Sequence, residues 1–256
     1  MVAQRSAVDG ALQCALGMFQ ALKNKLKRRL LYHLKRQLAA AAKDIELARQ
    51  FGAVHQSADF VDRNMPMAPS HPDKFTLLKA ALGQVEIQGL YCEFGVYQGK
   101  TLNFIAPLVK QEVHGFDSFE GLPEDWKQGH EKGTFAVKSL PDVRSNVRLH
   151  RGWFEETIPP FRGEHPGPVA FLHLDADLYS STHTVFDLLG DGIVPGTVIV
   201  FDEFFNYPGW ADGEYKAFGE FRQERNVQLR YLGFVRGGEQ VAVKIAAISP
   251  PQQLSE

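Results

Sequence analysis

The chain has 256 residues, 44% of them hydrophobic, which is enough for one substantial core and indicates one main domain with an extension. Its net charge of -2 argues against a nucleic-acid partner. Its two cysteines exclude a disulfide framework and a CxxC metal site, which favours a cytoplasmic location. We expect no transmembrane helix, because no apolar run is long enough, and no secretory signal, because the apolar stretch precedes the basic one.

The first 50 residues are basic, whereas the remainder of the chain is acidic. Residues 1–50 hold 10 lysines and arginines against 3 acids. From Phe19 to Leu38, apolar residues recur every three or four positions with basic residues between them, which predicts a basic amphipathic helix within a helical extension over 1–50. Two roles fit residues 19–43: packing against the main domain or a second copy of the chain, or contact with a membrane surface or an acidic partner.

A proline-containing segment follows the extension. Residues 51–72 include Pro66, Pro69 and Pro72 among polar residues, which predicts a linker or a lid. A helix is expected to begin near Asp73, and the main domain is therefore predicted to comprise residues 73–256.

Strands and helices alternate after this helix. Two strands are apolar throughout, as is typical of strands that are buried on both faces of a parallel sheet. The pattern predicts an α/β fold: a Rossmann-like, doubly wound, seven-stranded, mostly parallel sheet with helices on both faces and an antiparallel C-terminal edge hairpin. The expected strands are 89–94, 112–116, 146–151, 168–174, 196–201, 229–235 and 239–245.

The stretch "EFGVYQGKT", residues 93–101, follows the first expected strand and opens a helix. Ligands of such sheets bind at the carboxyl ends of strands, and Gly95 and Gly99 would let the backbone turn and approach a ligand. The spacing is not GxGxxG, which argues against a pyrophosphate-binding loop, whereas Glu93 suits a ligand with a cationic group. A turn that needs two glycines for structural reasons alone is the alternative.

Acidic residues end three further strands. Asp117 closes the second strand, where an acid can accept hydrogen bonds from two ribose hydroxyls; a turn cap is the alternative. Asp175 ends the fourth strand, and Asp202 and Glu203 end the fifth. Carboxylates on neighbouring strand ends suit Mg²⁺, so these three residues are a candidate metal site. Alternatively, Asp175 accepts an ordinary hydrogen bond while the other two cap turns.

Taken in order, these segments resemble the class I S-adenosyl-methionine-dependent methyltransferases, and more narrowly the macrocin O-methyltransferase group of the TylF, MycF and NovP type. The resemblance covers about residues 73–246 and leaves the basic helix outside. It rests on "EFGVYQGKT", "GFDSFEGLP" at 115–123, "GWFEETIP" at 152–159, "LDADLYSST" at 174–182 and "PGTVIVFDEF" at 195–204.

The resemblance implies S-adenosyl-methionine as the cofactor, with its methionine part near Glu93, its ribose at Asp117 and its adenine beside Trp153. The implied cofactor residues are Glu93, Gly95, Gly99, Thr101, Asp117, Ser118, Gly152, Trp153, Phe154 and Asp175. The group binds a divalent cation where Asp175, Asp202 and Glu203 fall, although Glu203 replaces the usual aspartate.

The implied reaction is O-methylation of a hydroxyl on a sugar or another small-molecule natural product, by in-line displacement at the sulfonium methyl carbon. A metal-bound diol would lose its proton more readily, and a histidine or carboxylate would accept it. His173 and Asp175 are the candidate catalytic residues, because side chains two apart on a strand point to the same side. His173 as a core histidine is the alternative, and His150 is a weaker candidate for the base.

Three rival classes are open. The chain could bind the cofactor in the same fold without metal-dependent catalysis, which a broad panel of acceptors would reveal. It could be a nicotinamide-dependent dehydrogenase, which the missing GxGxxG disfavours. It could act through residues 19–43 as a membrane- or partner-binding protein, which deletion of that segment would separate from cofactor binding.

Overall fold

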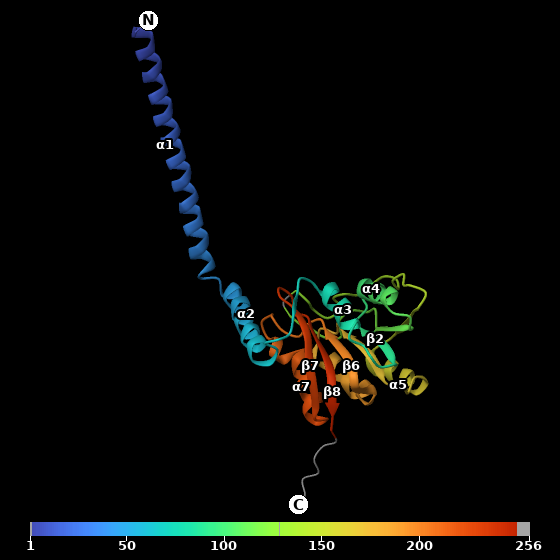
Figure 1. Ribbon diagram of the computed structural model, residues 1–256. Helices are drawn as coiled ribbons and strands as arrows, with labels where there is room; N and C mark the ends of the chain where they lie inside the picture. The colour runs from blue at the N-terminus through green and yellow to red at the C-terminus, as the bar shows by residue number, and fades with distance from the viewer. Residues whose placement is uncertain (1, 128, 250–256) are drawn as a thin grey trace, which may run out of the picture. The chain divides into compact units, whose positions relative to one another are not determined.

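The computed structural model describes residues 2–127 and 129–249, which divide into two compact units, Met1–Gly52 and Ala53–Glu256. In the first unit, α1 (Val2–Ala41) is one continuous helix and α2 (Ile45–Asn64) begins after a short turn (Figure 1). The large apolar side chains of α1 are exposed from Met18 onward. Within the described ranges, no helix is both long and apolar enough to cross a membrane.

The linker predicted for residues 51–72 is wrong for its first part, because α2 continues to Asn64. Ala53 and Phe60 are buried at helical spacing on the second half of α2, and the Phe60 ring packs edge-on against Phe204. The three prolines that suggested a linker all follow Asn64, the last residue of α2. They therefore mark the C-terminal boundary of this helix, and the residues before them are helical.

The second unit is built around one sheet with the strand order β1-β7-β8-β6-β5-β2-β3-β4. Neighbouring strands from β6 through β5, β2 and β3 to β4 are parallel, whereas β8 is antiparallel to both β6 and β7. The prediction of a doubly wound, mostly parallel sheet is confirmed. The strands are β1 (Ser70–His71), β2 (Leu90–Phe94), β3 (Val113–Asp117), β4 (Val147–Arg151), β5 (Val169–Leu174), β6 (Ile193–Phe201), β7 (Val227–Val235) and β8 (Val241–Ile248).

The sheet has eight strands where seven were expected. The additional strand, β1, contains only Ser70 and His71, which are too few to show an apolar alternation, and it pairs parallel with β7. The C-terminal hairpin of β7 and β8 is present, but β8 inserts between β6 and β7 and β1 lies outside β7. The hairpin therefore does not form the edge of the sheet by itself.

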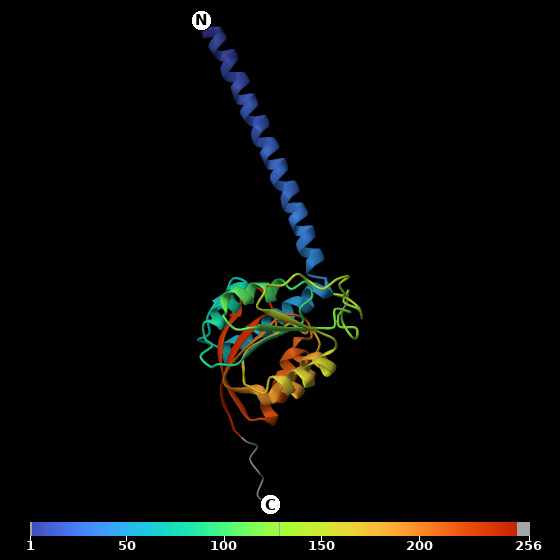
Figure 2. The same ribbon diagram turned by 90° about the vertical axis from the view of Figure 1, so that its right-hand side faces the viewer.

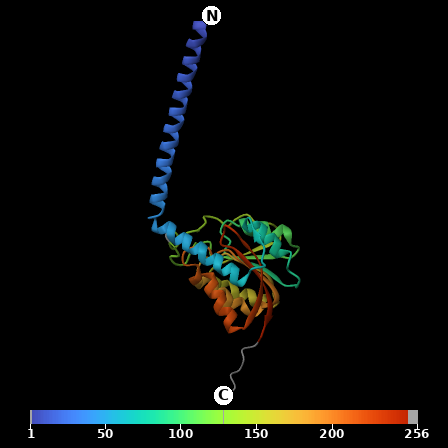
Figure 3. The same ribbon diagram turned by 60° about the vertical axis from the view of Figure 1, so that its left-hand side comes forward.

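Helices cover both faces of the sheet, with α3 and α4 on one side and α5 and α7 on the other (Figures 1, 2 and 3). Phe171 belongs to the core under α3 and α4, and the next residue, Leu172, belongs to the core under α5, α6 and α7. Successive strand residues point to opposite faces, so an apolar run is needed to serve both cores. The remaining helices are α3 (Lys74–Leu82), α4 (Lys100–Ile105), α5 (Phe154–Glu164), α6 (Tyr179–Leu189) and α7 (Glu214–Glu224), with 3₁₀ turns η1 (Ala106–Leu108), η2 (Gly190–Gly192) and η3 (Trp210–Asp212).

The strand order reverses between β2 and β5. From β2 the chain proceeds outward through β3 to β4, and it then returns to β5 and β6 on the other side of β2. The carboxyl ends of β2 and β5 therefore border a crevice, which is where open α/β sheets bind their ligands. The fold thus predicts the place of the site before any side chain is considered.

Candidate functional site

A cavity of about 520 Å³ lies at the carboxyl ends of β2, β3, β4 and β5, within the unit Ala53–Glu256. This volume is in the range of pockets for small ligands. Four segments that follow these strands contribute to its wall: 95–98, 117–118, 153–155 and 175–177. The cavity is therefore built by the strand ends that the sequence motifs occupy.

The loop after β2 depends on Gly95. Its φ of +91° is unfavourable for other residues, and a Cβ atom at this position would overlap the backbone carbonyl of Asp175. Gly95 therefore allows the ends of β2 and β5 to approach closely while lining the cavity. Gly99 also has a positive φ, of +70°, but it precedes α4 and lies outside the cavity wall, whereas Thr101 of α4 belongs to it.

The Asp117 carboxylate ties the loop after β2 to the end of β3. It accepts hydrogen bonds from the backbone N–H groups of Val96 at 2.8 Å, Tyr97 at 2.7 Å and Phe119 at 2.6 Å. A carboxylate offers about four acceptor positions, so capacity is left for a ligand hydroxyl. Asp117 and Ser118 both line the cavity, where the sequence predicts the ribose.

The segment after β4 supplies aromatic side chains. Trp153, the N-cap residue of α5, and Phe154 line the cavity, and flat apolar side chains of this kind suit the faces of a purine ring. Gly152 stands directly before them with a φ of +144° and is not part of the cavity wall. This positive φ lets the chain turn between β4 and α5, which brings Trp153 and Phe154 to the cavity.

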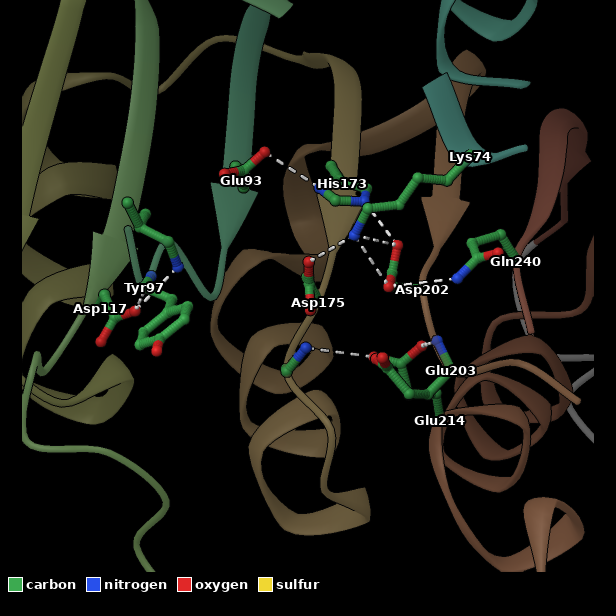
Figure 4. Close-up of polar contacts among 12 residues, drawn as sticks. Lys74, Glu93, Tyr97, Asp117, His173, Asp175, Asp202, Glu203, Glu214 and Gln240 are labelled. Atoms are coloured by element: carbon green, nitrogen blue, oxygen red, sulfur yellow. Dashed lines mark hydrogen bonds and ion pairs between the residues drawn. The ribbon is translucent and has the colours of Figure 1, made fainter. Parts of the chain in front are cut away.

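Glu93 and His173 face each other on neighbouring strands, and neither lines the cavity. Glu93 Oε2 lies 3.0 Å from His173 Nδ1, and both residues are fully buried (Figure 4). Burial opposes the imidazolium, but the nearby carboxylates of Asp202 and Glu93 outweigh it and raise the pKa of His173 to about 10. Because His173 is fully buried and does not line the cavity, its ring nitrogens are out of reach of a ligand bound there, which disfavours His173 as the base.

The carboxylate of Asp202 is buried and accepts hydrogen bonds from two side chains. Both of its carboxylate oxygens lie 3.2 Å from Lys74 Nζ, and Oδ2 also accepts a hydrogen bond from Gln240 Nε2 at 3.2 Å. His173 Nε2 is 3.6 Å from Oδ1. Burial opposes the anion, but these partners outweigh it and lower the pKa of Asp202 to about 2. Asp202 is therefore a fixed anion whose lone pairs are already engaged.

Asp175 connects this network to the cavity. Its Oδ2 is 3.6 Å from Lys74 Nζ, its side chain is 27% exposed, and it lines the cavity. Burial and the charge of Asp202 raise the pKa of Asp175 above the usual range for an aspartate. A partly exposed carboxylate at the cavity wall is within reach of a bound ligand, so in its ionised form Asp175 can accept a proton from that ligand.

Glu203 lies in a different cluster of side chains from its neighbour Asp202. Carboxylate oxygens of Glu203, Asp175 and Asp177 lie within 4.8 Å of one another, and Glu203 Oε2 is buried with no hydrogen-bond partner among the described residues. Burial and the charges of Asp175 and Asp202 raise the pKa of Glu203 well above its usual value. The Glu203 N–H donates to the buried carboxylate of Glu214 at 3.1 Å.

The predicted metal set of Asp175, Asp202 and Glu203 does not assemble. In the described part of the chain, Asp202 groups with Asp175 and His173, and Glu203 groups with Asp175 and Asp177, so no grouping holds all three. In this arrangement the Lys74 ammonium group, and not a metal ion, lies against both carboxylate oxygens of Asp202, so we derive no chemical step through a divalent cation.

Sequence reasoning missed several residues of the site. Lys74 and Asp177 were assigned no role, yet both line the cavity beside Asp175. Asp177 lies inside the quoted motif "LDADLYSST", so its acidic type was an available signal. Lys74 belongs to no motif, and only the position of α3 at the carboxyl ends of β5 and β6 brings it to the site.

A cavity at the switch point, with an acid at the end of the strand next to β2 and aromatic residues after β4, is an arrangement typical of α/β proteins that bind nucleosides. Residues 92–204 match a family described as a methyltransferase domain, and this segment spans β2 to β6 and the cavity walls between them. The matched segment is therefore similar in sequence to methyltransferase domains.

Curated relatives match about half of the chain. The 8-demethyl-8-(2,3-dimethoxy-alpha-L-rhamnosyl)-tetracenomycin-C 4'-O-methyltransferase of Streptomyces olivaceus is 30% identical over 144 residues, covering 46% of this chain and 54% of that protein. The demethyldecarbamoylnovobiocin O-methyltransferase of Streptomyces niveus is 25% identical over 158 residues, covering 51% and 59%. The chain thus spans less than two thirds of the length of either relative.

Solved structures show the same fold. The calicheamicin methyltransferase CalS11 superposes with a TM-score of 0.53 at 22% identity, covering 79% of this chain and 93% of that one. The O-methyltransferase NovP superposes with a TM-score of 0.55 at 18% identity, covering 67% and 79%. The Rossmann-like fold is therefore that of these methyltransferases.

Proposed function

We propose that this protein is an S-adenosyl-methionine-dependent O-methyltransferase that acts on a hydroxyl of a small molecule, such as a sugar-containing natural product. The observation that carries the proposal is the cavity at the switch point, which combines Asp117, Trp153 and Asp175 within the segment that matches a methyltransferase domain. The names of both curated relatives describe O-methyltransferases, and one of those names includes a rhamnosyl group.

The proposed cofactor position follows the cavity wall. The backbone at Gly95 would approach the methionine part, Asp117 and Ser118 would bind the ribose, and Trp153 with Phe154 would enclose the adenine. Glu93 is withdrawn into its pair with His173, so its effect on the cofactor would be indirect. S-Adenosyl-methionine supplies a methyl group on a sulfonium, which makes the methyl carbon the electrophile.

In the proposed reaction the acceptor oxygen attacks the methyl carbon, an O–C bond forms, the C–S bond breaks, and its electron pair stays on sulfur. The protein must hold oxygen and carbon at roughly 3–3.5 Å in line with the breaking bond. The hydroxyl proton has to leave, and Asp175 is the proposed acceptor because its carboxylate lines the cavity and is 27% exposed.

Calorimetric titration with S-adenosylhomocysteine, followed by a panel of sugar and phenolic acceptors with S-adenosyl-methionine, tests this proposal. We expect saturable nucleoside binding and methyl transfer to at least one hydroxyl. Binding without turnover would favour a non-catalytic cofactor-binding protein. A chain that is folded by circular dichroism but binds no S-adenosylhomocysteine would contradict the proposal.

We also propose that α1 contacts an anionic membrane surface. Residues 19–43 contain no acidic residue, and Leu22, Leu26 and Leu30 are 64%, 69% and 68% exposed. A helix with basic residues and exposed leucines has the composition of interfacial helices. Full-length protein should sediment with phosphatidylserine vesicles and not with phosphatidylcholine vesicles, and the charge-reversing pair Arg28→Glu and Arg29→Glu should abolish this. Equal recovery with both lipids, or gel filtration showing a stable dimer that binds neither, would contradict it.

A further inference from the structure

The ammonium group of Lys74 lies between the ends of two neighbouring strands. Lys74 Nζ is 3.2 Å from both carboxylate oxygens of Asp202, which follows β6, and 3.6 Å from Oδ2 of Asp175, which follows β5 (Figure 4). Among the described residues, Lys74 is the one lysine or arginine paired with either carboxylate. A single positive charge therefore joins two acids that the sequence assigned to a metal ion.

The position of Lys74 is fixed by the start of α3. The preceding residue, Asp73, caps this helix by accepting the Thr76 N–H at 2.9 Å, and Leu77 and Leu78 are buried one turn later. The Lys74 side chain is only 29% exposed. An ordered helix start and a largely buried side chain leave the ammonium group little freedom to move away from the two acids.

Lys74 also lines the cavity, together with Asp175. A positive group at the wall of a partly closed site interacts strongly with charge that develops on a bound ligand. The ammonium group is therefore in a position to influence an acceptor oxygen as its proton leaves, which is the task that a bound metal ion performs elsewhere.

We propose that Lys74 is the resident cation of this site, in the place that the family resemblance assigns to a divalent metal ion, and that the protein works without such a metal. This inference rests on the proposed function for its chemical meaning. The geometry on which it rests, a lysine paired with Asp175 and Asp202, is independent of any acceptor.

A divalent ion would compete with Lys74. If it bound Asp202, it would have to displace the ammonium group from both carboxylate oxygens. If it bound the grouping of Asp175, Asp177 and Glu203, it would share Asp175 with the ammonium group. Two positive charges on one carboxylate repel each other, so the presence of Lys74 weakens metal binding in either arrangement.

Mn²⁺ binding to the full-length protein, followed by electron paramagnetic resonance, tests the proposal without an acceptor. We expect wild-type protein to bind no stoichiometric Mn²⁺, and Lys74→Met to bind one Mn²⁺ with an affinity higher by roughly 10-fold or more. Lys74→Arg, which keeps the charge, should behave as wild type. Lys244→Met is the matched control, because Lys244 is also largely buried and pairs with an acid, Glu86, but does not line the cavity.

Two results would overturn the proposal. One is that wild-type protein binds stoichiometric Mn²⁺ and that Asp202→Asn or Asp177→Asn abolishes this binding. The other is that folded Lys74→Met and wild type bind Mn²⁺ with equal affinity. If Lys74→Met does not fold, the wild-type measurement still decides. Titration of the same wild-type sample with S-adenosylhomocysteine, with and without a chelator, separates the two proposals. If the chelator abolishes binding, the role proposed for Lys74 is also overturned. If S-adenosylhomocysteine binds in neither condition, only the proposed function is contradicted.

Discussion

Glu93 Oε2 lies 3.0 Å from His173 Nδ1, on two neighbouring central strands and out of reach of solvent. Asp202 stands 3.6 Å from the other ring nitrogen, so the imidazole is held between two carboxylates. Asp202 also has the Lys74 ammonium group beside it, whereas His173 is the partner of Glu93, whose pKa is raised by burial. Removing the partner of a buried acid is strongly destabilising. Glu93 and His173 therefore have a structural role outside the cavity wall, and their substitution should lower the free energy of unfolding.

His173→Gln should lower the free energy of unfolding by roughly 3–5 kcal/mol at neutral pH, because it leaves Glu93 buried without its cationic partner and leaves Asp202 with Lys74 alone. Urea denaturation followed by circular dichroism measures this change. His183→Gln is a matched control on a surface helix, where the histidine is 37% exposed, and it should change stability by less than about 1 kcal/mol. Equal stability of His173→Gln and wild type would contradict the pairing.

The pH dependence of stability gives the same pair a second test. The pKa of His173 is about 10 in the folded protein and about 6.5 in the unfolded chain, so the folded state binds the extra proton between these values. The contribution of protonated His173 to the free energy of unfolding is therefore complete below pH 6.5 and is lost as the pH rises through 10. Wild-type stability should therefore fall between pH 7 and 10 more steeply than that of His173→Gln, and parallel curves would contradict the raised pKa.

Gly95→Ala should destabilise the protein far more than Gly99→Ala, although both glycines have a positive φ in one loop. An added Cβ at Gly95 would overlap the Asp175 carbonyl, whereas at Gly99 the nearest atom is Pro141 Cβ at 3.3 Å. We expect a loss of roughly 2–5 kcal/mol at Gly95 and about 1–2 kcal/mol at Gly99, measured by urea denaturation. Equal losses would show that the close approach of β2 and β5 is unimportant.

Asp117→Ala should weaken the binding of S-adenosylhomocysteine by roughly 1.5–3 kcal/mol, through lost hydrogen bonds to the ribose and a loosened loop after β2. Calorimetry measures the dissociation constant. Asp142→Ala removes a carboxylate from an exposed residue outside the cavity and should leave the constant unchanged. An unchanged constant for folded Asp117→Ala would remove this residue from the cofactor site.

Local sequence patterns were sufficient to predict the sheet and the place of the cavity. Apolar runs such as 168–174 define buried strands, and the acids that follow strands mark the carboxyl ends where ligands bind. Side-chain pairing across strands was not predictable, because it depends on register: Glu93 lies opposite His173, a relationship set by two strands 80 residues apart. Lys74 was missed for a similar reason, since a helix start reveals nothing about which strand ends it approaches.

Glu203→Gln should make the protein more stable at pH 8. Burial raises the pKa of Glu203 well above its unfolded value, and the charges of Asp175 and Asp202 raise it further. The folded state therefore binds an extra proton above the unfolded pKa, so wild-type stability falls as the pH rises through that window. A glutamine carries no charge and can donate a hydrogen bond to the nearby Asp175 or Asp177.

We expect a gain of roughly 1–3 kcal/mol for Glu203→Gln at pH 8, shrinking toward zero near pH 4, measured by urea denaturation at both values. Glu131→Gln is the control for a carboxylate on an exposed residue, and it should remain within about 0.5 kcal/mol of wild type at both pH values. If Glu203→Gln were less stable than wild type at pH 8, the ionised carboxylate would be stabilising the fold. That outcome would contradict the absence of a hydrogen-bond partner for Glu203 Oε2.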